Sequence, residues 1–247
     1  MENPTPTASH EACVVEAGRG WAWWPEAWAL FTKSALLWVA LGVILIVGFG
    51  VISMVPFIGT VATALLMPVF IGSWLLAARK VEGGGALEVA DLFTCFKGDR
   101  FTPLLVIGAL LLAAIVVIGL VAGVLGAGAM FGMMGGGGAR EPMGAGVMAV
   151  AGAGFAALLV VLLICMVISM ALWFAPALVV FRNVPPVDAL RASTLTVLKN
   201  WLPCLVYGLI YFVAAIVASI PFGLGWIVLA PVLLLTMYTS YQDVYGA

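Results

Sequence analysis

The chain has 247 residues, of which 65% are hydrophobic and 9% are charged, and its formal net charge is −1. Soluble domains carry about 25% charged residues, so this composition excludes a water-soluble globular protein and predicts an all-α polytopic membrane protein. A net charge near zero also excludes the basic surface that nucleic-acid binding requires.

Residues 1–20 are polar and acidic, which predicts a disordered cytosolic tail. They lack the basic start and apolar middle of a signal peptide, so we expect the first apolar helix to stay in the membrane. The single histidine lies in this tail and the cysteines have no paired spacing, so we expect free thiols, no metal site and no cofactor. The histidine is His10, and the cysteines are Cys13, Cys95, Cys165 and Cys204.

The first unit of the chain begins with a tryptophan-rich segment that predicts a surface helix at 24–33. Trp24 and Trp28 are four residues apart on one helical face, and tryptophan rings prefer the headgroup layer. We therefore expect both to be interfacial anchors. Two apolar stretches follow, each close to the roughly 20 residues that cross a bilayer. We place the first two spans at 34–54 and 57–78.

The second unit begins after a run of three glycines, with a surface helix predicted at 86–97. Phe93 and Phe96 lie on its apolar face and are expected to anchor it in the headgroup layer. Residues 126–146 are rich in glycine and methionine and predict an external loop. Methionine suits Cu(I), but no external Cys or His accompanies it, so we expect a loop rather than a metal site. The spans on either side of the loop are placed at 104–124 and 156–179.

The third unit begins with two prolines, which suit the first turn of a surface helix predicted at 186–199. Trp201 follows it and is expected to be another interfacial anchor. The remaining elements are two spans at 203–220 and 224–241 and a short cytosolic tail at 242–247.

A short apolar phrase around a proline recurs in the second span of each unit, at Pro68, Pro176 and Pro231. The residues around Pro103 also align without gaps with those around Pro203. These matches predict three parallel repeats, each a surface helix followed by a helical hairpin. A proline inside a helix removes one backbone hydrogen bond and bends the helix, so we predict kinks at the three span prolines.

The basic residues indicate the orientation of the chain in the membrane. Lys and Arg collect in cytosolic loops, and with a cytosolic N-terminus nine of the ten fall in inside segments. We therefore predict six spans in the bacterial inner membrane. Both termini and all three surface helices are expected on the cytoplasmic side.

The predicted spans hold no ionisable residue deep in the membrane. This weighs against an ion-coupled pump and against an enzyme with a buried acid–base pair, so we expect no catalytic residues. An acidic residue begins each surface helix, at Glu26, Glu88 and Asp188. One interpretation is that these residues complement the positive end of a helix dipole. The other is that they form a docking rim for a protein partner on the cytosolic face.

Several phrases resemble a family of bacterial six-span inner-membrane proteins, usually described as hypothetical membrane proteins. These phrases lie at residues 90–93, 96–97, 103–105, 175–179, 189–193 and 200–201. The family is distantly similar to the membrane domain that precedes some glycerophosphodiester phosphodiesterases. The resemblance covers residues 21–241 and implies the six-span fold. No phosphodiesterase domain is attached to this chain, so the resemblance does not imply that activity.

We therefore expect a non-enzymatic inner-membrane protein that binds a partner or organises lipid through its cytosolic amphipathic helices. The alternative is a small permease or channel for an uncharged or lipid-like solute, with the kinked second, fourth and sixth spans around its path. Three amphipathic helices on one face favour the first hypothesis. The composition requires one partner, which is the lipid bilayer.

Overall fold

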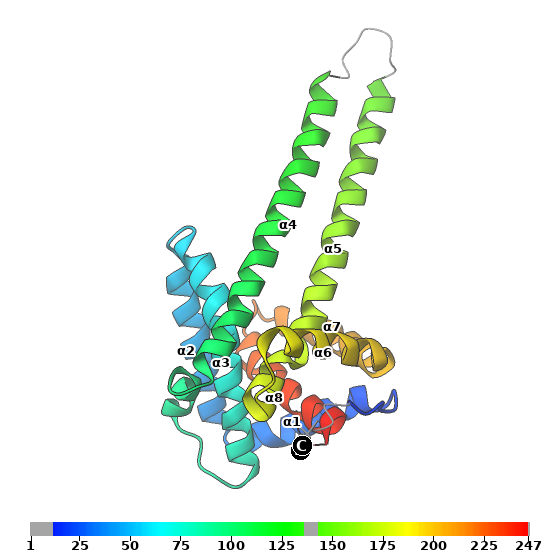
Figure 1. The fold of residues 1–247 in the computed structure, drawn as a ribbon. Helices are drawn as coiled ribbons and strands as arrows, with labels where there is room; N and C mark the ends of the chain where they lie inside the picture. The colour runs from blue at the N-terminus through cyan, green and yellow to red at the C-terminus, as the bar shows by residue number, and fades with distance from the viewer. Residues whose placement is uncertain (1–11, 136–142, 247) are drawn as a thin grey trace, which may run out of the picture.

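The computed structural model describes residues 12–135 and 143–246, and its regular elements over this range are all helices (Figure 1). The all-α prediction is therefore confirmed. Eight are α-helices and η1 is a 3-10 helix. In chain order they are α1 (Arg19–Lys33), α2 (Ala35–Ser53), α3 (Ile58–Glu82), η1 (Val89–Phe96), α4 (Phe101–Gly135), α5 (Met143–Arg182), α6 (Pro186–Lys199), α7 (Trp201–Ser219) and α8 (Trp226–Tyr245).

Six stretches of these helices are long and apolar enough to cross a membrane, which confirms a polytopic membrane protein. They are Ala35–Ser53, Ile58–Glu82, Phe101–Val124, Gly154–Arg182, Trp201–Ser219 and Trp226–Tyr245. Helices α3 and α8 continue past their predicted ends at 78 and 241, so most of the predicted tail 242–247 is helical. The polar residues at these ends bond to one another: the Gln242 side chain donates to Glu82 Oε2 at 2.6 Å.

Helices α4 and α5 are much longer than the bilayer is thick, and Figure 1 shows them projecting together far beyond the other helices. At about 1.5 Å per residue, their 35 and 40 residues extend about 50 and 60 Å, against a hydrocarbon core of about 30 Å. The predicted external loop at 126–146 is therefore helical at 126–135 and 143–146. Glycine weakens a helix without breaking it, and α4 contains no proline after Pro103. Residues 136–142 of that loop lie outside the described residues.

The second surface element is a short 3-10 helix rather than the predicted α-helix at 86–97. Its ends, Glu88 and Lys97, have extended backbone, and the side chains of Glu88 and Asp91 form a capping box at its start. The buried residues Leu92 and Cys95 are three apart, and this spacing puts both on one face of a helix with three residues per turn. The 3-10 geometry thus lets η1 bury both residues while it packs on α3.

One side of helix α1 packs on the protein, a contact that the sequence did not predict. Trp23, Ala27, Leu30 and Phe31 are buried, and the helix packs against α7 and α8. Trp28 remains exposed. Composition alone did not reveal that the side of α1 holding Trp23 packs on other helices of the same chain.

The three short elements α1, η1 and α6 each pack on the last helix of another unit, as a three-unit repeat requires. Element η1 packs on α3, α6 packs on α5, and α1 packs on α8, which closes the series. A hydroxyl group joins each pair. The Cys95 N–H donates to Ser73 Oγ at 3.0 Å, the Phe174 N–H donates to Ser193 Oγ at 2.9 Å, and Thr239 Oγ1 donates to the Trp23 carbonyl at 3.1 Å. We call the end of the molecule formed by α1, η1, α6 and the C-terminal ends of α3, α5 and α8 the base.

Candidate functional site

The three span prolines lie inside continuous helices and are buried. Gly42 of α2 packs so closely on Pro231 that a Cβ atom at this glycine would lie 2.9 Å from the proline ring. Pro231 also lines an apolar pocket of about 250 Å³ between α2, α3 and α8. The predicted kinks at Pro68, Pro176 and Pro231 remain predictions.

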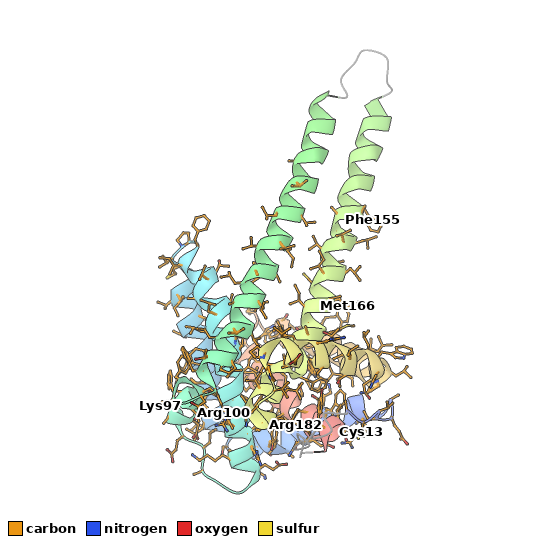
Figure 2. The ribbon with its side chains drawn as sticks, viewed as in Figure 1. Cys13, Lys97, Arg100, Phe155, Met166 and Arg182 are labelled. Carbon is orange, nitrogen blue, oxygen red and sulfur yellow. The ribbon has the colours of Figure 1, made fainter. Side chains whose placement is uncertain are left out.

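A polar cleft lies at the base, where the C-terminal ends of α3, α5 and α8 meet. Its volume is about 300 Å³, at the small end of the range of ligand pockets. Figure 2 shows one of its residues, Arg182, at the base, far from the projecting parts of α4 and α5. The lining residues are Arg79, Glu82, Phe181, Arg182, Tyr238, Tyr241 and Gln242.

Two arginines give the cleft its positive charge. Arg182 Nε donates to the Tyr241 hydroxyl at 3.2 Å, a terminal nitrogen donates to the Tyr245 carbonyl at 2.5 Å, and the guanidinium carbon lies 5.2 Å from the Tyr245 ring centroid. These contacts fix the orientation of Arg182. Arg79 is exposed and lies 5.4 Å from the Phe181 ring centroid. Within the described part of the chain it has no hydrogen-bond or ion-pair partner.

The acidic part of the cleft is Glu82. Its Oε2 atom accepts a hydrogen bond from the Tyr238 hydroxyl and another from Gln242 Nε2, each 2.6 Å long. Gln242 Nε2 also lies 3.0 Å from the Tyr238 hydroxyl. One oxygen of this carboxylate is thus held by α8, and the described lining combines two guanidinium groups with one carboxylate.

A second polar network at the base closes α1 against α8. Asp243 Oδ2 accepts hydrogen bonds from Arg19 Nε at 2.8 Å and from Trp23 Nε1 at 2.9 Å. The hydrogen bond from Arg19 to Asp243 and the attraction between the two charges raise the pKa of the Arg19 guanidinium above its ordinary value. This network fixes the tryptophan-rich helix under the last span.

Part of the predicted disordered tail 1–20 is also fixed at the base. The Asn200 side chain accepts from the Val15 N–H at 2.9 Å and donates to the Cys13 carbonyl at 3.1 Å. The Cys13 N–H donates to the Val244 carbonyl at 2.9 Å. Helix α1 starts at Arg19, so the order begins well before residue 20. Residues 1–11 of that tail lie outside the described residues.

The three acidic residues of the predicted docking rim lie on different elements and have different surroundings. Glu26 pairs with Arg19 at 2.9 Å. Glu88 forms part of the capping box of η1 and lies 3.8 Å from Lys80 Nζ. Asp188 is exposed in the first turn of α6. Two of the three therefore have partners within the chain.

The predicted interfacial anchors divide into exposed and packed residues. Trp28, Phe93 and Trp201 are exposed. Trp24 stacks on Tyr207 with ring centroids 5.1 Å apart, and Phe96 is half-buried beside other aromatic rings. The exposed three are therefore the ones in position to contact lipid.

Helix α6 occupies the predicted residues, and three of its large apolar side chains face outward. Val187, Leu195 and Leu198 are 63%, 51% and 52% exposed. The side that packs on the protein buries Ala189, Ser193, Thr196 and Val197. We call Val187, Leu195 and Leu198 the outer face of α6.

Sequence reasoning missed the cleft because its residues were assigned to span ends and a tail. The sequence did hold one indication of it. Arg79 and Gln242 follow Pro68 and Pro231 at the same spacing, so the repeat itself places both residues at equivalent helix ends. The described residues hold no group of three or more His, Cys, Asp or Glu side chains that could hold a metal ion.

Comparisons with known proteins agree with the membrane fold. A family model described as "Domain of unknown function (DUF7847)" matches residues 26–244. The chain is also similar to the probable inner membrane protein BTH_II0599 of Burkholderia thailandensis, with 28% identity over 215 residues that cover 85% of this chain and 78% of the relative. No solved structure matches. The predicted similarity to the membrane domain of glycerophosphodiester phosphodiesterases is not among these findings.

Proposed function

The chain belongs to the DUF7847 family, and from this premise we propose that it is a non-enzymatic inner-membrane protein that organises lipid at the cytosolic leaflet. The observation that carries the proposal is the outer face of α6. Three large apolar side chains are exposed there on a helix that is held to the protein by its other side. An amphipathic helix in this position buries its apolar face at the boundary of headgroups and acyl chains.

The surroundings of the outer face favour lipid over a protein partner. Trp201, which prefers the headgroup layer, follows α6 directly and is exposed. Arg191 lies on the same face of α6, four residues from both Val187 and Leu195, and a long arginine side chain can bury its stem while its charge stays among headgroups. The orientation predicted from the Lys and Arg residues would place the base at the cytosolic, anionic leaflet.

The burial of the three span prolines weighs against the alternative of a permease, because the pocket beside Pro231 holds only about 250 Å³. The docking-rim interpretation is also weakened, since Glu26 and Glu88 already have partners within the chain. Of the functions considered, lipid organisation is the one that uses the apolar side chains exposed on the outer face of α6.

Quenching of a fluorophore placed on the outer face tests the proposal. In a background with Cys13→Ser and Cys165→Ser, which removes the exposed thiols, the dye is attached at Leu195→Cys. The matched control is Ala86→Cys, an exposed position in the connection between α3 and η1. In reconstituted vesicles, lipids with brominated acyl chains should quench the dye at 195, and aqueous iodide should quench the dye at 86. Equal quenching by iodide at both positions would refute the proposal.

A second measurement asks whether the contact organises lipid. Spin-labelled lipids report the fraction of lipid that is motionally restricted around the reconstituted protein. The double variant with Leu195→Glu and Leu198→Glu should lower this fraction, because each change places a charge where apolar surface met acyl chains. An unchanged fraction in a correctly folded double variant would contradict the lipid-organising role.

A further inference from the structure

We propose that the cleft between Arg79, Glu82, Arg182 and Tyr241 binds a zwitterion that carries a phosphate and a primary ammonium, as a phosphoethanolamine headgroup does. The inference rests on the proposed function in one respect, which is that the base faces the headgroup layer. It goes further by naming the ligand chemistry and the residues that recognise it.

The phosphate would be recognised by the two arginines. Guanidinium groups present planar sets of N–H donors that match phosphate oxygens. Arg182 is held in a fixed orientation by the Tyr241 hydroxyl and the Tyr245 carbonyl. The Arg79 donors have no hydrogen-bond partner in the described part of the chain, and its guanidinium stacks on Phe181 beside the cleft. The arginines come from different helices, so each can approach one of the two non-bridging oxygens of a phosphodiester.

The ammonium would be recognised by Glu82. Tyr238 and Gln242 both bond to Oε2 of this carboxylate, which fixes the group at the wall of the cleft. A primary ammonium carries three N–H donors, so it can bond to a carboxylate. A quaternary trimethylammonium has none.

The positions of the charges in the cleft favour a ligand with both signs of charge over a simple anion. Among the described residues, the lining holds two guanidinium groups and one carboxylate. In addition, the C-terminal ends of α3, α5 and α8 each contribute partial negative charge. An anion without an ammonium would meet the arginines but bring no N–H donor to Glu82 and no positive charge to the helix ends. A ligand with both groups complements both sides.

The cleft also has a suitable size and wall for such a headgroup. Its volume of about 300 Å³ is small for a ligand pocket. Phe181 and Tyr241 form one stacked wall, with ring centroids 5.2 Å apart and an interplanar angle of 28°. This wall gives the ligand a flat apolar surface between its charged ends.

Native mass spectrometry of the full chain in detergent tests the inference. The probes are phosphatidylethanolamine, phosphatidylglycerol and phosphatidylcholine with identical acyl chains, together with soluble glycerophosphoethanolamine. The three lipids share the phosphodiester, and only the first carries a primary ammonium. We expect phosphatidylethanolamine to bind most tightly. If glycerophosphoethanolamine binds as tightly as the lipid, recognition lies in the headgroup alone. If the lipid binds more tightly, the ligand comes from the bilayer. Both results support the proposed chemistry.

Three variants assign the two halves of the site. Arg79→Gln should weaken phosphatidylethanolamine binding by about tenfold or more, the scale of one lost charge-assisted hydrogen bond. Glu82→Gln should keep the contact with Tyr238 but reduce the affinity for phosphatidylethanolamine to that for phosphatidylcholine. Lys97→Gln makes the same charge change as Arg79→Gln at an exposed base residue outside the cleft, and it should leave binding unchanged.

Two results would overturn the inference. One is phosphatidylglycerol binding as tightly as phosphatidylethanolamine to the unaltered protein. The other is an equal effect of Arg79→Gln and Lys97→Gln, which would mean that general charge attracts the lipid. Neither result bears on the outer face of α6, since quenching at position 195 is measured independently of the cleft. Failure of the ligand assignment is therefore distinguishable from failure of the proposed function.

Discussion

Replacing Asp243 by alanine should destabilise the protein chiefly by leaving one tryptophan N–H without a partner. Asp243 Oδ2 accepts hydrogen bonds from Trp23 Nε1 at 2.9 Å and from Arg19 Nε at 2.8 Å. The Trp23 side chain is completely buried, at 0% exposed. Asp243→Ala therefore removes the hydrogen bond that the Trp23 N–H makes within the described part of the chain.

The two lost bonds differ in energy. A buried donor left unsatisfied costs about 1–3 kcal/mol. The ion pair contributes less than about 1 kcal/mol after allowance for solvent screening, because the Arg19 side chain is 37% exposed. We therefore expect Asp243→Ala to cost about 2 kcal/mol and Arg19→Gln to cost less than about 1 kcal/mol. Asp243→Asn retains an oxygen for Trp23 and should resemble Arg19→Gln.

Unfolding of the purified protein by a denaturing detergent, followed by tryptophan fluorescence, measures these differences. The expected order is a large loss for Asp243→Ala and small, similar losses for Asp243→Asn and Arg19→Gln. If Asp243→Asn were as costly as Asp243→Ala, the charge would be the main source of stability and the argument from the buried Trp23 N–H would be wrong.

Two further predictions use matched pairs of residues. Gly108→Ala should cost about 1–3 kcal/mol of stability through overpacking, because its new Cβ would lie 2.5 Å from the Leu65 carbonyl oxygen. Gly119→Ala should be near neutral, because nothing lies within 4 Å of its new Cβ. Equal thermal unfolding temperatures for the two variants would contradict this packing. Burial raises the pKa of the Cys95 thiol above its ordinary value, and the thiolate is the reactive form. Maleimide at pH 8 should therefore label exposed Cys13 rapidly and Cys95 only after unfolding, as mass spectrometry of the peptides can show; rapid labelling of Cys95 in the folded protein would exclude its burial against α3.

The six spans were predictable from the sequence because lipid imposes a simple length rule on apolar runs. The same rule explains a partial failure. The apolar run from 147 to 181 is longer than a span, so the prediction placed the span only at 156–179 and a loop at 126–146. Glycine and alanine instead allow α5 to remain helical from Met143. Apolar composition indicates what the bilayer can solvate, but it does not indicate where a helix ends.

The base was harder to predict because its structure depends on contacts between distant residues. Trp23 and Trp28 look alike in the sequence, yet one is buried against Asp243 and the other is exposed. Arg79 and Arg182 each suited a helix end, where basic residues are common. Only the folded arrangement of α3 and α5 places them in one cleft.

The closure of α1 against α8 has a consequence for biogenesis. Trp23 and Asp243 are separated by 220 positions. At a synthesis rate of roughly 5–20 residues per second, the ribosome needs about 10–40 s after making Trp23 to supply its partner. During that interval the face of α1 that holds Trp23 has no protein surface to pack on, so the headgroup layer or a chaperone must cover it. The surface on which α1 packs is thus complete only after α8 has been synthesised.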